Sequence, residues 1–136
     1  MLSHFLYRST ATPGLNDSDI QQILTEARER NARLGLTGCL HVEDGIFFQW
    51  LEGSAAPVAE VVGMLRRDSR HSDIETLSEG PLQSRLFDHW SMLMSDRNDS
   101  SIVNWLAEQA VSRWDGARYI AAILQFMQKM SLNIGR

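Results

Sequence analysis

LTGCLHVEDGIFFQWLEG, residues 36–53, contains two apolar runs joined by Asp44-Gly45. The dipeptide Asp-Gly between strand-like runs favours a two-residue hairpin, because both central residues of that turn need a positive φ. The stretch therefore predicts two antiparallel strands that are neighbours in one sheet.

The residues before this hairpin predict a strand and then a helix. LSHFLYRS, residues 2–9, is short and aromatic and is followed by turn-forming residues, which is typical of a strand. A helix is predicted between a cap at Asn16 or Ser18 and a stop near Gly35. Its apolar residues have the spacing of one helix face: Ile20, Ile23, Leu24 and Ala27.

The residues after the hairpin repeat this alternation. Ser54 opens a second predicted helix, which tolerates Pro57 in its first turn and ends around Asp68. Its apolar face consists of Val58, Val61, Val62 and Leu65. Residues 74–82 and 89–95 are predicted strands, so the order of elements is βαββαββ.

Two more helices are predicted at the C-terminal end, one capped by Ser100 and one beginning at Asp115. The predicted fold class is therefore α+β, with a ferredoxin-like βαββαββ core and two additional C-terminal helices. The two core helices pack on one face of such a sheet, and the C-terminal helices are expected to cover the other face. We place the core in residues 1–95 and the helical extension, packed on it, in residues 96–136.

Composition narrows the class of protein. A chain of 136 residues with a formal net charge of −4 forms one domain and has no overall field that attracts nucleic acid. Cys39 is the only cysteine, and the four histidines have no ligand spacing with it, so a disulfide scaffold and a metal site are not expected. No uncharged apolar run approaches the ~20 residues of a membrane helix, and no signal peptide is recognisable. We therefore expect a cytoplasmic protein with no membrane partner.

Three polar residues, Tyr7, Asn31 and Gln49, stand where the pattern calls for apolar ones. Gln49 lies between Phe48 and Trp50, so its amide is buried on either assignment of the strand faces and needs hydrogen-bond partners. The residues alone leave simpler interpretations open. Tyr7 can be a core tyrosine, Asn31 a helix C-cap, and Gln49 a structural amide.

Other groups give weaker signals. Asp68, Arg70 and His71 cluster after the second helix, either as a solvated loop or as an anion contact. Cys39 is predicted to be a small core residue. The carboxylates form no pair that can be placed in one cleft, and no glycine-rich phosphate loop is present, so neither acid–base catalysis nor phosphate transfer is supported.

Five motifs taken together resemble one known family. They are Tyr7-x-Ser9, Asn31 followed by LGLTGCL at 34–40, FFQWLEG at 47–53, the set Asp68, Arg70 and His71, and Arg85-x-Phe-x-x-Trp90-Ser91-Met92. In this order they look like the BLUF domain, a flavin-binding blue-light sensor, over roughly residues 1–95. The resemblance implies a ferredoxin-like fold with a flavin between the two core helices.

The resemblance also implies roles for individual residues. Tyr7 would be the photochemical electron donor, Gln49 the amide that links it to the flavin, and Asn31 a ligand of the flavin C4=O and N3 edge. Ile23 and Leu40 would be apolar walls, while Asp68, Arg70 and His71 would lie toward the ribityl-phosphate side. The neighbours that tune and relay the change at Gln49 would be Ser9, Trp90 and Met92. The cofactor would be FAD, with FMN as the alternative.

The output of such a sensor is expected to pass through the C-terminal helices to an unidentified downstream protein or to other copies in a homo-oligomer. Four residues are candidates for that interface, or else cover the bare sheet face: Tyr119, Ile123, Phe126 and Met130. We expect no enzyme activity from this chain. The alternatives are a small ferredoxin-like hydrolase of the acylphosphatase type and a flavin-free regulatory module.

Overall fold

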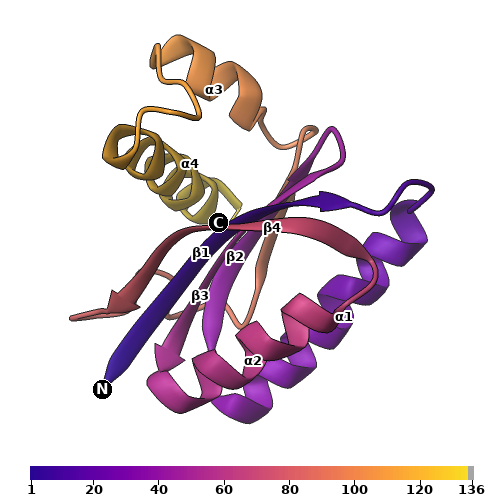
Figure 1. Ribbon diagram of the computed structural model, residues 1–136, viewed down its shortest axis with the longest axis vertical. Helices are drawn as coiled ribbons and strands as arrows, with labels where there is room; N and C mark the ends of the chain where they lie inside the picture. Colours follow the sequence, from indigo (N-terminus) through magenta and orange to yellow (C-terminus); the bar gives the residue numbers. More distant parts are fainter. Residues whose placement is uncertain (135–136) are drawn as a thin grey trace.

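The computed structural model describes residues 1–134 as a five-stranded sheet with helices on both faces (Figure 1). The elements are β1 (Leu2–Ala11), α1 (Asp17–Leu34), β2 (Thr37–Glu43), β3 (Ile46–Ser54), α2 (Ala55–Arg67), β4 (His71–Pro81), β5 (Leu93–Asp96), α3 (Ile102–Glu108) and α4 (Ala117–Ile134). The strand order is β4-β1-β3-β2-β5, in which only β2 and β5 are parallel neighbours. The predicted α+β class and ferredoxin-like core are confirmed.

The hairpin between β2 and β3 fixes the centre of the sheet. Asp44 and Gly45 have φ values of 52° and 76°, as the two central residues of such a turn require. The register places Gln49 opposite Leu40 on β2 and opposite Tyr7 on β1. These three side chains therefore form one row across three strands, on the same face of the sheet.

Helix α1 begins and ends at residues that the sequence predicts. The Asn16 side chain accepts a hydrogen bond from the Asp19 N–H, while the Asp19 carboxylate accepts one from the Asn16 N–H, which is a capping box. The helix stops at Gly35, which has a φ of 68°. Ser54 precedes α2 as predicted, but its side chain makes no capping hydrogen bond.

The sheet is buried on both faces. α1 and α2 cover one face of the sheet, and α3 and α4 cover the other (Figure 1). Phe47, Gln49 and Leu51 lie on the α1 and α2 side, whereas Phe48 and Trp50 lie on the α3 and α4 side. The four residues proposed from sequence as interface candidates on α4 are all buried on this second face: Tyr119, Ile123, Phe126 and Met130. They cover the bare sheet face, so they do not offer an exposed interface.

The prediction of a strand over residues 89–95 is wrong for residues 89–92. β5 begins only at Leu93, because non-local hydrogen bonds hold the preceding loop: the buried Glu52 carboxylate accepts from the Leu86 and Phe87 N–H groups at 2.8 and 2.9 Å. Trp90 and Met92 consequently do not share a strand face. Trp90 packs on the α3 and α4 side, and Met92 is buried on the α1 and α2 side.

Smaller differences occur at other ends. β4 begins at His71 rather than Ile74, and α3 is capped by Ser101 rather than Ser100. The Ser101 hydroxyl accepts from the Asn104 N–H at 3.1 Å. α3 ends at Glu108, two residues before Ala110, whose φ of 53° lies outside the helical region.

The two edges of the sheet differ in length. β4 has 11 residues, but its pairing with β1 changes register twice, between Leu6 and Tyr7 and between Arg8 and Thr10. β5 has four residues and pairs with β2 alone.

Candidate functional site

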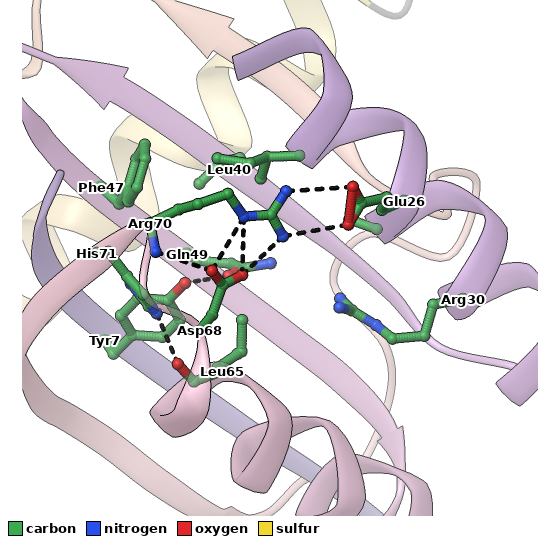
Figure 2. Close-up of a pocket in the computed structure, with 12 residues that line it drawn as sticks. Tyr7, Glu26, Arg30, Leu40, Phe47, Gln49, Leu65, Asp68, Arg70 and His71 are labelled. Atoms are coloured by element: carbon green, nitrogen blue, oxygen red, sulfur yellow. Dashed lines mark hydrogen bonds and ion pairs between the residues drawn. The ribbon is translucent and has the colours of Figure 1, made fainter. Parts of the chain in front are cut away.

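A pocket lies between α1, α2 and the sheet (Figure 2). Its floor is the row of Tyr7, Leu40 and Gln49 on the sheet. One face of α1 forms a wall, and the segment after α2 forms the mouth. Its lining residues are Tyr7, Ile23, Glu26, Ala27, Arg30, Leu40, Phe47, Gln49, Leu65, Asp68, Arg70 and His71.

The floor of the pocket is a tyrosine–glutamine pair. The Tyr7 hydroxyl donates to Gln49 Oε1, and Gln49 Nε2 points to the Met92 sulfur at 3.8 Å. Burial, reinforced by the charge of Asp68 and opposed by that of Arg30, raises the pKa of Tyr7 well above its ordinary value. The phenol is therefore a neutral donor, and Gln49 has one strong partner and one weak one, since a thioether sulfur is a poor acceptor.

His71 supports Tyr7 from behind. Its Nε2 lies 2.7 Å from the Leu65 carbonyl oxygen, which can only accept, so Nε2 carries the proton. Its Nδ1 then accepts from the Ser9 hydroxyl at 2.7 Å. The His71 ring meets the Tyr7 ring edge-on, with 5.8 Å between ring centroids. Ser9 thus fixes Tyr7 indirectly and does not itself line the pocket.

Charged residues close the mouth of the pocket (Figure 2). Arg70 donates to Asp68 from Nε at 2.9 Å and from Nη2 at 2.7 Å, and it reaches across to both oxygens of Glu26 on α1 at 3.1 Å. The hydrogen bonds from Arg70 lower the pKa of Asp68, and the same pairing raises the pKa of Arg70. Asp68 and Arg70 are therefore an ion pair, and the bonds from Arg70 to Glu26 tie the segment after α2 to α1.

Arg30 is the cation of the pocket that has no carboxylate partner among residues 1–134. Its Nε and Nη2 lie 3.4 and 3.3 Å from Asn31 Oδ1, and Figure 2 shows its side chain on the α1 wall, apart from the Arg70 cluster. Burial lowers its pKa, yet an arginine stays protonated in proteins. Arg30 also lines an outer cleft next to the pocket, together with Arg33, Met64 and Arg67.

Asn31 is fully buried, but it does not line the pocket. Its Nδ2 donates to the Ser91 carbonyl oxygen at 2.6 Å. On the same loop, the Met92 carbonyl oxygen accepts from Arg28 Nε at 3.1 Å. α1 therefore holds the loop that carries Met92.

The structure brings together most of the residues that the sequence singled out. Seven line the pocket: Tyr7, Ile23, Leu40, Gln49, Asp68, Arg70 and His71. Ser9, Asn31 and Met92 lie one contact behind it, and Trp90 lies on the other face of the sheet. The sequence interpretation missed Glu26, Ala27 and Arg30, although their spacing from Ile23 places them on the same helix face. It also missed Phe47, which alternates with Gln49, and Leu65 at the end of α2.

The donors and walls of this pocket suit a flavin. Ile23, Leu40, Phe47 and Leu65 can enclose the apolar part of a planar ring. Gln49 offers an amide that donates and accepts, and Arg30 offers a cation, which match the carbonyl and nitrogen edge of such a ring.

Residues 2–93 match the BLUF family, described as sensors of blue light using FAD, and the chain belongs to this family. The photoactivated adenylate cyclase subunit beta of Euglena gracilis is 35% identical over 92 residues, which are 67% of this chain and 11% of that protein. The chain therefore spans about a tenth of the length of this curated relative.

Two solved structures extend the similarity to the fold. BlrB, a BLUF protein in its dark state, superposes with a TM-score of 0.82 at 28% identity, covering 94% of this chain and 96% of that one. A bacterial light-regulated adenylyl cyclase superposes with a TM-score of 0.73 at 25% identity, covering 95% of this chain and 36% of the other. The Tyr7–Gln49 hydrogen bond fits the light-sensing mechanism of the family.

Within residues 1–134, no helix is both long and apolar enough to cross a membrane. The same residues contain no cluster of three or more histidine, cysteine, aspartate or glutamate side chains suited to a metal ion.

Proposed function

We propose that this chain is a blue-light photoreceptor that binds FAD non-covalently in the pocket between α1 and α2 and signals by rearranging the Tyr7–Gln49 hydrogen bond. The observation that carries the proposal is the buried contact between these two residues, in which Gln49 has a strong partner on one side only. A flavin in this pocket would supply absorption of blue light and acceptance of an electron.

The chain's own residues can hold and redirect one proton at the pocket floor. Tyr7 keeps its phenolic proton and donates it in a hydrogen bond to Gln49 Oε1, because burial disfavours the phenolate. Rotation or tautomerisation of the Gln49 amide exchanges donor for acceptor, and no covalent link to the cofactor is needed. The ring of His71, fixed by Ser9 and the Leu65 carbonyl, restrains Tyr7 while this happens.

Individual residues take the following places in the proposal. Ile23 and Leu40 form the walls, and Arg30 and Asn31 would hydrogen-bond to the polar edge of the ring. For this, Asn31 must exchange its bond to the Ser91 carbonyl for one to the cofactor. The ribityl-phosphate side is assigned to Asp68, Arg70 and His71. Met92 relays the change at Gln49, and Trp90 acts only from the opposite face.

FAD is favoured over FMN by the outer cleft. Arg30, Arg33 and Arg67 line it, and guanidinium groups are suited to a pyrophosphate. The cofactor released from the purified protein on denaturation should therefore have the mass of FAD. Release of FMN alone would contradict this part of the proposal.

Signalling is proposed to be non-enzymatic. Two relatives are named as cyclases, and this chain spans 11% and 36% of them. Within this chain, an output to another protein or to a homo-oligomer is assigned to residues 96–136, the helical extension of the core at 1–95. A cytoplasmic location is part of the same proposal.

The deciding experiment compares absorption spectra before and after blue light for the parent and Gln49→Leu. The parent should be yellow and shift reversibly. Gln49→Leu should still bind flavin, because the ring is held mainly by other residues, yet should lose the shift, because leucine can neither donate nor accept. A colourless parent that cannot be reconstituted with flavin would instead favour the hydrolase or flavin-free alternatives. A normal shift in Gln49→Leu would contradict the role of Gln49.

A further inference from the structure

A second buried polar cluster lies on the face of the sheet opposite the pocket. It consists of His41 and Glu43 on β2, Ser95 on β5, and Ser101 at the start of α3. The exposed fractions of His41, Glu43 and Ser95 are 0%, 3% and 1%. Buried polar groups destabilise a fold unless they are bonded. Here each finds a partner, and the partners come from different elements.

The hydrogen bonds of this cluster converge on the Glu43 carboxylate. A carboxylate only accepts, so His41 Nε2 donates to Glu43 Oε1 at 2.9 Å. Burial lowers the pKa of His41, so the ring is neutral, and its Nδ1 accepts from the Ser95 hydroxyl at 2.8 Å. Ser95, His41 and Glu43 therefore form a polar chain from β5 through β2, with a defined position for every proton.

Glu43 connects this polar chain to α3. Its carboxylate accepts from the Ser101 hydroxyl at 2.6 Å and from the Ile102 N–H at 2.8 Å. Burial by itself raises the pKa of Glu43, but the bonds from Ser101, His41 and Ile102 outweigh it and hold the pKa below its ordinary value. A seven-residue helix has little stability of its own, so its start depends on this carboxylate.

The other end of the polar chain lies close to the pocket. β5 begins directly after Met92, whose sulfur is 3.8 Å from Gln49 Nε2, and Ser95 is three residues further on. β5 is an edge strand of four residues held by one neighbour, in which Ser95 pairs with His41. Such a strand is among the easiest parts of a sheet to displace. A displacement of Met92 would therefore change the spacing between Ser95 and His41 first.

We propose that Ser95, His41 and Glu43 act as positioning residues that pass a light-driven displacement of β5 to the first turn of α3. The proposal rests on the proposed function, since it needs a change at Gln49 to start it. The His41 ring also packs edge-on against Phe126, with 4.8 Å between ring centroids, so the same displacement reaches α4. The signal thus crosses the sheet within the core, separate from the exposed connector at residues 97–99.

The test is hydrogen exchange of residues 102–108 in the flavin-loaded chain, in darkness and under blue light. In the parent, light should raise the exchange rate of these amides severalfold. Ser95→Ala should keep the spectral shift and the dark protection of α3, because Glu43 still caps it, but should lose the light-induced change. Ser95→Thr, which keeps a hydroxyl, should restore the change. Ser91→Ala is the matched control outside the polar chain and should behave like the parent.

A mutation-free measurement accompanies this test. The ¹⁵N resonance of His41 Nδ1 should move on illumination, because its bond to Ser95 changes. An unchanged resonance, or a light-induced change at α3 that survives in Ser95→Ala, would overturn the proposal. A parent with a spectral shift but no response at α3 would overturn the polar chain alone, whereas a parent with no spectral shift would overturn the proposed function as well.

Discussion

Two sets of buried polar residues, one on each side of the sheet, differ in how completely they are hydrogen-bonded. On the face toward α3 and α4, His41, Glu43 and Ser95 bond to one another and to the start of α3. On the face toward α1 and α2, the partner of Gln49 Nε2 among residues 1–134 is a sulfur, and that of the Arg30 guanidinium is an amide oxygen. We call the first set the closed cluster, because its groups bond to one another and support the fold. The second is the open set, because its donors remain available to a ligand in the pocket. His41 on β2 and Gln49 on the neighbouring β3 face opposite layers, because successive side chains of a strand point to opposite faces.

The closed cluster should lose the most stability when it is broken. Glu43→Ala leaves His41, Ser101 and the first N–H of α3 without an acceptor, so we expect the free energy of unfolding to fall by about 3 kcal/mol. Urea denaturation followed by far-UV circular dichroism measures this. Glu43→Gln keeps one acceptor oxygen and should lose less. No loss in Glu43→Gln would mean that the side chain acts only by filling space.

The open set should affect ligand binding more than stability. Arg30→Gln removes an unpaired cation from the pocket, so we expect roughly tenfold weaker flavin binding, about 1.4 kcal/mol, with no loss of stability in the flavin-free protein. Fluorescence titration with flavin measures the affinity. Arg118→Gln on α4, an exposed position that lines neither the pocket nor the outer cleft, is the control and should bind flavin as the parent does.

Removing the Tyr7 hydroxyl from the pocket floor should abolish the photochemistry but leave the fold nearly as stable. Tyr7→Phe keeps the aromatic ring but removes the donor to Gln49, so the reversible light-induced shift should be lost at a stability cost of about 1 kcal/mol. Tyr119→Phe is the matched change on the other face, where the hydroxyl accepts from Arg8 at 3.0 Å, and it should keep the shift. If Tyr7→Phe cycles as the parent does, Tyr7 is not the donor.

Acid should weaken the closed cluster gradually. Because burial lowers the pKa of His41, the unfolded chain binds this proton at a higher pH than the folded chain. The resulting stability is present above the ordinary histidine pKa of about 6.5 and is lost as the pH falls through it toward the folded value. The lowered pKa of Glu43 acts in the same direction at more acidic pH.

We expect the free energy of unfolding to fall as the pH is lowered from about 7 to about 5. His41→Gln should flatten this dependence, whereas His89→Gln should not, since the His89 side chain is 90% exposed. Urea midpoints measured across this pH range give the slopes. The same slope in His41→Gln and in the parent would place the titration elsewhere.

The local signals in the sequence predict most of the fold. Asp44-Gly45 fixes a hairpin, and the caps at Asn16 and Gly35 bound α1, because these depend on residues a few positions apart. The loop conformation of residues 89–92 could not be predicted from such local signals. It depends on Glu52, which is more than 30 residues away in sequence and holds the loop through its N–H groups.

The candidate site was predictable where a polar residue interrupts an apolar pattern. Tyr7 and Gln49 stand out for this reason, and the register of β1 and β3 brings them together. Arg30 does not stand out, because a charged residue on a helix is usually solvent-exposed. Glu43 was missed because its partners, His41 aside, come from a distant part of the chain.

The unequal edges of the sheet have a consequence for aggregation. An exposed strand edge is a template on which another chain can add a strand. β5 is short, and β4 breaks register twice and carries Asp73, Glu75 and Glu79. Both edges therefore disfavour edge-to-edge growth into fibrils, even though the strands between them are unusually rich in apolar side chains. The protein should accordingly remain dispersed at the high concentrations that spectroscopy of a photoreceptor requires.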